Sequence, residues 1–447
     1  MKKYLLHFIV AALYCSSAIG QTCSEPFLGS KTLYKAESHQ TDAPPGFLPV
    51  FINHVGRHGA RHLTNEINSS AIYKLLLKAD SSEDLTADGD RLKKKIVLLD
   101  SIEKKYIKSI SDAGKKEQAG LARRMYENYR NVFVQPASVV SVDYTKEIRT
   151  LQSSEAFLGS LRTGVKNLQV KQQQANDTTL RFYDLSPAYR AFKKNGSWIK
   201  SLGELKKQLN YQELTDNISK KFFKPARLNK LTEEDREDFV SGMYGLITIV
   251  FSIQKEIADA GYSAADLDIQ SFLGCKELLV LAEIDNAEDF LQKGPATGLD
   301  AIRVTIAAPL LADFIQSTDN FIRTGSVQAN LRFSHAETIA PFAALLSFKT
   351  ASEPVQNVEA ISRVWQAANV IPLSANIQWI LYQKTGSKDD FLIKFLLNEK
   401  EAKLIGLPAQ TFPYYKWSEV REFYLHKLET LQLLPGQNYF DYLQQLK

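Results

Sequence analysis

The sequence predicts an α/β fold, in which helices flank a central sheet and a long helical segment interrupts the chain. β-rich apolar runs followed by helical spacing begin at residues 46, 136 and 329. Residues 165–300, in contrast, are rich in lysine and follow a helical pattern. Alternation of strand and helix is typical of an α/β sheet, and 447 residues that are 44% hydrophobic allow two domains or one domain with a large insertion.

The first part of the chain supplies two strand–helix pairs. Residues 46–59, GFLPVFINHVGRHG, form an apolar run that ends in glycines, which predicts a buried strand and a tight loop. Helical spacing follows over residues 65–79 and 84–131. A second strand is predicted at 136–145 and a helix at 146–161, so the order is strand, helix, strand, helix.

The rest of the chain contains the insertion and the return to the sheet. Residues 165–300 show no run of strands and predict an α-helical insertion that acts as a lid. A strand–loop–helix pattern resumes at 329–348, and residues 376–384 and 390–404 predict two adjacent strands joined by a turn at 385–387. The sheet-containing domain is expected to be discontinuous, formed by residues 24–164 and 301–447.

The first 20 residues have the layout of a secretory signal peptide. Lys2 and Lys3 precede an apolar stretch and small residues follow it, so cleavage is expected after residues 18–20. The apolar run is short for a spanning helix, which weighs against a membrane anchor. A buried first helix and a lipid attached at Cys15 or Cys23 are lesser alternatives. The protein is therefore expected to be exported, periplasmic or secreted, with no membrane span after cleavage.

The net charge and the cysteine content limit the classes of partner and the cellular compartments that fit the sequence. Of the 55 lysines and arginines, two lie in the expected signal peptide, so 53 basic residues face 50 acidic ones and the charge balance indicates no nucleic-acid partner. Cys23 and Cys275 remain in the expected mature chain and allow one disulfide, which the sequence does not establish. The fold is not expected to depend on a framework of disulfides, which favours the bacterial envelope as the location of an exported protein.

Several common catalytic signatures are absent. The sequence contains no Walker phosphate loop, no G-x-S-x-G elbow, no H-E-x-x-H and no C-x-x-C. His54, His58 and His62 are spaced by four, as ligands on a helix face would be. However, Gly56 and Gly59 lie between them and the preceding run predicts a strand, so the sequence gives little support for a metal site.

The loop RHGAR, residues 57–61, is the first candidate for chemistry. It leaves the end of a predicted strand, where ligands of open α/β sheets bind. Arg57 and Arg61 can grip a phosphoryl group through forked hydrogen bonds, and a ring nitrogen of His58 can attack phosphorus. Gly59 would let the backbone approach the anion. A basic surface loop with one packed histidine is the alternative.

Two later segments repeat this arrangement. RTLQSSEAF, residues 149–157, opens a helix after a strand, so Arg149 is expected near a helix N-terminus, where anions are favoured. RFSHAET, residues 332–338, also follows a strand and opens a helix. His335 would hydrogen-bond phosphoryl oxygens and Glu337 would protonate a leaving oxygen. Taken alone, each segment is too short to exclude a solvated side chain.

In this order RHGAR, RTLQSS (149–154) and HAE (335–337) resemble the histidine phosphatase superfamily, in its histidine acid phosphatase branch. The HAE form and LRFYDLSPAY (180–189) are similar to the multiple inositol polyphosphate phosphatases, a subgroup of the phytases. The resemblance spans most of the expected mature chain and implies a phosphoglycerate-mutase-like mixed sheet flanked by helices. Leu63 stands where the family motif R-H-G-x-R-x-P often has proline, which puts the rigidity of the loop in question.

The resemblance also implies a role for each motif residue. His58 is the nucleophile and forms a phosphohistidine, and Glu337 protonates the leaving alcohol. The phosphate-binding residues are Arg57, Arg61, Arg149 and His335. No metal or other cofactor is then required. Because His58 must be neutral and Glu337 protonated, the highest rate is expected from acidic to near-neutral pH.

A polyanionic substrate needs further cations for the phosphates outside the cleavage pocket. The candidates in the insertion are Arg181, Arg190, Lys193 and Lys194, with Lys224 and Arg227 further along, and Ala336 is added from the HAE motif. For each cation, a solubilising surface charge is the alternative. His62 is unusual beside the motif and is expected to be packed or solvated more than to line the pocket.

The sequence thus predicts an exported phosphomonoesterase that hydrolyses inositol polyphosphates, especially inositol hexakisphosphate. A broad acid phosphatase or sugar phosphatase on the same fold is the nearest alternative. A phosphate-binding protein without activity would need neither His58 nor Glu337, and a mutase-like isomerase fits export poorly. Oligomeric state and the order of phosphate removal stay open.

Overall fold

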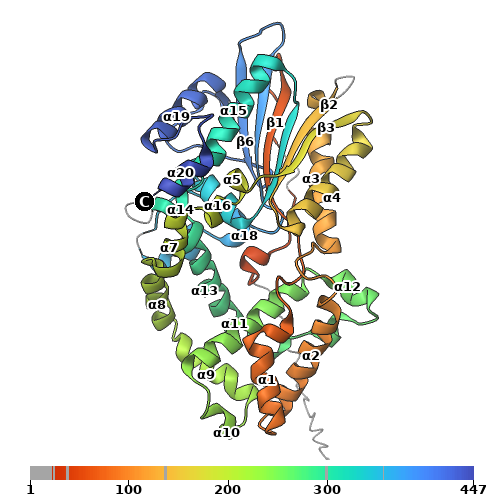
Figure 1. Cartoon of the computed structure of the whole chain (residues 1–447), viewed down its shortest axis with the longest axis vertical. Coiled ribbons are helices and arrows are strands. Elements are labelled where there is room, and N and C mark those ends of the chain that lie inside the picture. The colour runs from red at the N-terminus through yellow and green to blue at the C-terminus, as the bar shows by residue number, and fades with distance from the viewer. Residues whose placement is uncertain are drawn as a thin grey trace, which may run out of the picture.

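The structure is a computed structural model that describes residues 23, 26–36, 40–134, 138–296, 301–355 and 357–446. The expected signal peptide, residues 1–20, lies outside the described residues. Figure 1 shows an elongated molecule with a strand-rich part at one end and a helical part at the other.

A mixed sheet of eight strands confirms the α/β fold. The strands lie in the order β3-β2-β4-β1-β5-β6-β7, and β8 pairs with β6. Their bounds are β1 (Phe47–Arg57), β2 (Ser138–Tyr144), β3 (Leu168–Ala175), β4 (Ala329–Ser334), β5 (Asn376–Lys384), β6 (Phe391–Leu397), β7 (Lys400–Glu401) and β8 (Tyr414–Lys416). Strands β3, β2, β4 and β1 are mutually parallel, whereas β5 is antiparallel to both β1 and β6.

Parallel pairing brings three strand ends to one edge of the sheet. Arg57 of β1 is paired with Ser334 of β4, and Tyr144 of β2 is paired with Phe333 of β4. The segments that follow these strands carry the three sequence motifs, so the motifs converge. The strands predicted at residues 46–59, 136–145 and 329 onward are therefore confirmed, as are β5 and β6.

Helices cover both faces of the sheet and form most of the rest of the described chain. The bounds are α1 (Ala71–Ser81), α2 (Ala87–Glu103), α3 (Asp112–Asn128), α4 (Ile148–Gly164), α5 (Asp177–Leu180), α6 (Phe182–Leu185), α7 (Pro187–Asn195), α8 (Trp198–Gln208), α9 (Tyr211–Phe222), α10 (Pro225–Leu228), α11 (Glu233–Val250), α12 (Gln254–Asp259), α13 (Cys275–Lys293), α14 (Ile302–Thr305), α15 (Ala308–Thr324), α16 (Ala336–Leu345), α17 (Ile361–Val364), α18 (Ala367–Val370), α19 (Trp417–Thr430) and α20 (Tyr439–Gln445). Within the described residues, none of these helices has both the length and the apolar character that crossing a bilayer requires.

Alternation along β1 explains why both faces of the sheet are covered. Ile52 belongs to a core shared with α3 and α4, whereas Phe51 and Val55 belong to the core on the other face. Phe51 stacks on Phe321 of α15, with ring centroids 4.8 Å apart. Because successive side chains of a strand point to opposite faces, β1 is buried on both faces from Phe51 to Arg57, and it lies inside the sheet.

The structure corrects two expectations about the insertion. Residues 168–175, within the stretch predicted to be helical, form β3, an exposed edge strand. Residues 71–103, expected in the sheet-containing domain, form α1 and α2 and pack instead against α11 and α9 in the helical part (Figure 1). The apolar faces of α1 and α2, which include Leu76 and Leu99, join the same core as Phe239 of α11.

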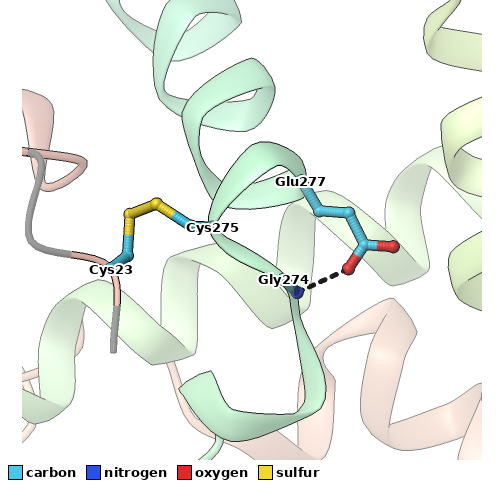
Figure 2. Close-up of a disulfide and its surroundings, with 4 residues drawn as sticks. All are labelled: Cys23, Gly274, Cys275 and Glu277. Atoms are coloured by element: carbon cyan, nitrogen blue, oxygen red, sulfur yellow. Dashed lines mark hydrogen bonds between the residues drawn. A yellow bond between two sulfur atoms is a disulfide. The ribbon is translucent and has the colours of Figure 1, made fainter. Parts of the chain in front are cut away.

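Cys23 and Cys275 form a disulfide, a pairing that the sequence leaves open. Figure 2 shows that it ties the N-terminal segment to the first residue of α13, where Glu277 accepts a hydrogen bond of 2.7 Å from the Gly274 N–H. The bond links residues 252 positions apart, so it restricts the unfolded chain strongly. Disulfides persist in oxidising compartments, which is consistent with an extracytoplasmic protein.

His54 of β1 is a buried histidine with an acid-sensitive role in stability. Its ring packs against Phe157 and Phe333, with centroids 5.4 and 5.6 Å away, and neither ring nitrogen has a hydrogen-bond partner among the described residues. Burial, aided by the charge of Arg332, lowers the pKa of His54 from 6.5 to about 3. The folded protein therefore excludes a proton that the unfolded chain accepts below pH 6.5.

We expect His54→Leu to reduce the acid sensitivity of the fold. In the wild type this histidine costs about 1.4 kcal/mol of unfolding free energy for each pH unit below 6.5, until its folded pKa is reached. Urea unfolding at about pH 7.5 and about pH 5 should show a loss of stability about 2 kcal/mol smaller in the variant. An equal loss in both proteins would show that His54 does not titrate in this way.

Candidate active site

The predicted residues come together where β1, β2 and β4 end. Arg57 is the last residue of β1 and His58 follows it. Arg149 lies in the first turn of α4, His335 is the N-cap of α16, and Glu337 lies in the first turn of α16. The rings of His58 and His335 meet edge to face, with centroids 5.5 Å apart.

His58 is buried and its ring orientation is fixed. Its backbone N–H donates to Ser334 O at 2.9 Å, and its ring Nδ1 lies 2.9 Å from Gly59 O. A carbonyl oxygen only accepts, so Nδ1 carries the proton and Nε2 carries the lone pair. Burial, followed by the charges of Arg57 and Arg149, lowers the pKa of His58 well below its ordinary value. At neutral pH the ring is therefore neutral, with a nucleophilic Nε2.

Arg57 is held in place by backbone carbonyls. Its Nη1 donates to Ser30 O and Ile371 O, each at 2.5 Å, and its own carbonyl accepts from Gln118 Nε2 at 3.0 Å. Burial lowers the pKa of Arg57, and burial together with the neighbouring arginines lowers that of Arg61 to about 10. Both guanidiniums are still charged at neutral pH.

His335 is held by two neighbours that fix its tautomer. Arg149 Nη2 donates to Nδ1 at 3.3 Å, since a guanidinium has no acceptor. Nε2 then carries the proton and donates to Thr145 Oγ1 at 2.8 Å. Burial and the charge of Arg149 lower the pKa of His335 well below its ordinary value. Thr145 was not a candidate, although it is the last residue of a predicted strand.

Glu147 connects Arg149 to Arg181. Its two carboxylate oxygens pair with Arg149 Nη1 at 2.7 Å and with Arg181 Nη1 at 2.8 Å. Burial would raise the pKa of Glu147, but the charges of the two arginines outweigh it and lower the pKa. Arg181 also pairs with Asp184 at 2.5 Å. Arg181 is therefore linked to Arg149 of the site through the carboxylate of Glu147.

Glu337 faces a lysine that the sequence did not single out. Lys293 Nζ, at the end of α13, lies 3.8 Å from Glu337 Oε1 and 2.5 Å from Asp289 Oδ1. Burial would raise the pKa of Glu337, but Lys293, followed by His335, outweighs burial and lowers it well below its ordinary value. Glu337 is therefore ionised in the ligand-free protein.

The role expected for Gly59 differs from the one observed. A Cβ on Gly59 would lie 2.5 Å from Gly114 O, and one on Gly114 would lie 2.1 Å from Ala60 O. The Gly59 N–H donates to Ser153 Oγ at 3.1 Å. Gly59 thus allows close packing of the loop on α3, and its amide is satisfied within the protein rather than free to receive an anion.

The cations of the insertion lie at different depths. Arg190, Lys193 and Lys194 are exposed side chains of α7, and their contact with substrate stays a prediction. Lys224 donates to Glu83 O at 2.7 Å and Arg227 is buried. Both are on or beside α10, at the end of the helical part far from α16 (Figure 1), so the structure gives no support to a contact between these two residues and distal phosphates. Ala336 is the buried first residue of α16.

The gathered residues have the charges and the free donors that suit an anion. The Nε–H groups of Arg57 and Arg149 are buried and have no acceptor among the described residues, so a phosphoryl oxygen would satisfy them. Within the same described part of the chain, no cluster of three or more His, Cys, Asp or Glu side chains is arranged to hold a metal ion. Three arginines beside two neutral histidines suit a tetrahedral, multiply charged anion.

This fold and site define a protein of phosphoryl chemistry, with its anion site at the carboxyl edge of a mixed α/β sheet. The sequence matches the histidine phosphatase superfamily (branch 2) over residues 50–398. The chain therefore belongs to that superfamily, as its three motifs predict.

Several known proteins resemble the chain. Multiple inositol polyphosphate phosphatase 1 of Gallus gallus is 22% identical over 330 residues, which cover 69% of this chain and 68% of that protein. The multiple inositol polyphosphate phosphatase of Bifidobacterium longum, solved in complex with inositol hexasulfate, has a TM-score of 0.78 at 21% identity, over 88% of this chain and 96% of that one. The phytase from D. castellii has a TM-score of 0.67 at 14% identity, over 93% and 87%.

Proposed function

We propose that this protein is an exported phosphatase that hydrolyses inositol polyphosphates, with inositol hexakisphosphate as its main substrate. The orientation of His58 carries the proposal. Because its Nδ1 is held by the Gly59 carbonyl, a neutral Nε2 is available beside Arg57, Arg61 and Arg149. A protein that only bound phosphate would need neither this nucleophile nor Glu337.

The reaction consists of two transfers. First, Nε2 of His58 bonds to phosphorus while the ester P–O bond breaks, and Glu337 gives its proton to the leaving alcohol oxygen. Water then attacks phosphorus, the P–N bond breaks, Glu337 takes the proton from that water, and inorganic phosphate leaves. The arginines stabilise the charge on the transferring group in both steps.

Substrate binding is needed to protonate Glu337. Lys293 keeps this carboxyl ionised in the ligand-free protein. A polyanion placed beside Lys293 offsets that charge, so binding raises the pKa of Glu337 towards the range in which it can act as an acid. The rate on an alkyl phosphate should therefore fall as pH rises. His58 stays neutral well below pH 6.5, so acidic conditions are tolerated.

The relatives support the substrate class. The proteins from Gallus gallus and Bifidobacterium longum are named for inositol polyphosphates, and the latter binds inositol hexasulfate. In this chain the residues proposed to lie near the remaining phosphates are Arg181, Arg190, Lys193, Lys194 and Ala336. The Cys23–Cys275 disulfide supports export to an oxidising compartment.

The test compares phosphate release from inositol hexakisphosphate and from p-nitrophenyl phosphate, at acidic and at neutral pH, with EDTA present. We expect kcat/KM for inositol hexakisphosphate to be at least about tenfold higher, because only this substrate offers phosphates to the outer cations. The opposite preference would favour a broad acid phosphatase. A folded protein that binds phosphate but releases none from either compound would contradict an enzymatic function.

A further inference from the structure

His62 follows Arg61 directly, and its ring contacts residues outside the anion site. Its side chain is buried, and its ring stacks on Tyr106, with centroids 4.7 Å apart and planes 20° apart. Nδ1 lies 2.7 Å from Glu103 Oε1, and Nε2 lies 3.6 Å from Glu256 Oε1. Of the two expected alternatives, packed or solvated, the structure shows the packed one, and the partners of His62 are two carboxylates from two different helices, α2 and α12.

Glu103 holds more than the histidine ring. Its second oxygen, Oε2, accepts the backbone N–H of Leu63 at 2.7 Å, and the whole residue is buried. Proline at position 63 could not donate this hydrogen bond. The Glu103 carboxylate therefore binds two consecutive residues, His62 and Leu63, on the C-terminal side of Arg61. Leu63 stands where the family motif often has proline.

The same two residues are bonded to Arg61 and to the segment after α2. Arg61 Nη1 donates to His62 O at 2.8 Å, so the guanidinium is positioned by the backbone that Glu103 fixes. The His62 N–H donates to Ser109 O at 3.0 Å, and the Lys108 N–H donates to Leu63 O at 2.7 Å. Movement of His62 would therefore move the phosphate-binding arginine.

We propose that His62, Glu103 and Glu256 form a clamp that positions Arg61 for the anion, and that the clamp is fully closed only while His62 is protonated. We call these three residues the His62 clamp. The inference depends on the proposed function only for the identity of the anion. Within the clamp, the protonated ring donates Nδ1–H to Glu103 and holds a charged Nε2–H 3.6 Å from Glu256 as an ion pair, whereas a neutral ring has a proton on one nitrogen only and loses that ion pair.

The charges around His62 give the direction of the pH effect. Burial would lower the pKa of His62, but the hydrogen bond to Glu103 and the charges of Glu103 and Glu256 outweigh burial and raise the pKa above 6.5. Tyr106 stacks on the ring, and Arg61 is the neighbouring cation that opposes protonation. Because the pKa is raised, the contribution of the clamp is complete below pH 6.5 and is lost as pH rises through the raised value.

The experiment measures the binding of inorganic sulfate, a tetrahedral dianion whose charge does not change between about pH 5 and pH 9, by titration calorimetry. Wild-type affinity should weaken as pH rises above neutral. In Glu103→Gln we expect a Kd about tenfold weaker at about pH 6 and little of this pH dependence, because the buried charge that favours protonated His62 is removed. His62→Gln should behave in the same way.

Glu256→Gln and His426→Gln complete the set. Glu256→Gln leaves both 2.7 Å contacts of Glu103 in place. It should flatten the pH dependence of sulfate binding with a smaller loss of affinity. This variant therefore tests the proposal if the other variants do not fold. His426, with 79% of its side chain exposed beside Glu429, is the matched histidine whose replacement should change nothing.

Sulfate affinities and pH slopes equal to those of the wild type in the folded clamp variants would overturn the proposal. Equal kcat values with raised KM on the phosphate substrate would support a positioning role, since the reacting groups are untouched. Sulfate binding with the expected pH slope, in a protein that releases no phosphate from any ester, would leave the clamp intact and refute only the proposed function.

Discussion

His58→Ala is expected to lower phosphate release from inositol hexakisphosphate by at least about 10⁴-fold, because the ring that would carry the phosphoryl group is gone. The remaining arginines still bind the anion, so KM and sulfate affinity should change far less than kcat. Release is measured as inorganic phosphate with EDTA present.

The matched control for this variant is His426→Ala, which removes an exposed histidine and should leave the rate unchanged. A melting temperature close to that of the wild type would show that His58→Ala is folded. If folded His58→Ala retained a tenth or more of the wild-type rate, His58 could not be the nucleophile.

Glu337→Gln is expected to lose about 10²- to 10⁴-fold in kcat on inositol hexakisphosphate, and much less on p-nitrophenyl phosphate. An inositol alkoxide is a poor leaving group and needs a proton, whereas p-nitrophenolate leaves without one. The measurement is the ratio of the two kcat losses, with an unchanged Kd for sulfate as evidence that the site is intact.

The proposed role of Glu337 also predicts the direction in which the rate changes with pH. In the complex the acid form of Glu337 is lost as pH rises, so the wild-type rate on the inositol substrate should fall on the alkaline side while the rate on the aryl ester falls less. Glu337→Gln should abolish that difference. Equal losses on both substrates would mean that Glu337 orients the substrate rather than protonating the leaving group.

The arrangement of the reacting residues followed from sequence because each motif directly follows a predicted strand. Strands at all three positions are predicted from their apolar residues, and parallel strands bring their carboxyl ends to one edge. The structure supplies the order of these strands, which the sequence does not predict, and this order brings residues 57–61, Arg149 and His335 together. The local sequence pattern was sufficient to predict these residues because they lie in the loops that follow the strands.

Partners contributed from distant parts of the chain could not be predicted in the same way. Ser30 and Ile371, which anchor Arg57, offer only backbone carbonyls, so their side chains carry no signal. Lys293 ends an ordinary amphipathic helix, and only tertiary packing places it beside Glu337. Gly114 and Gly59 depend on each other across a helix–loop contact that neither local sequence reveals.

The errors in the fold have physical causes as well. β3, with the sequence LQVKQQQA, is exposed along most of its length and lacks the apolar alternation that identifies a strand. It lies at the sheet edge, where its backbone pairs with β2 and the Gln172 side chain donates to Asp143 Oδ1 of β2 at 3.1 Å. Helices α1 and α2 look like any helices that follow a strand, and only their packing against α9 and α11 assigns them to the helical part.

The central claim is that His58 carries the phosphoryl group during turnover, and trapping that group tests it most directly. Protein mixed with labelled inositol hexakisphosphate is quenched in alkali, where a phosphohistidine survives, and the labelled peptide is identified by mass spectrometry. The account predicts an acid-labile phosphoryl group on the peptide that contains His58, and none in His58→Ala. Rapid turnover with no protein-bound label, or label on a different residue, would contradict it.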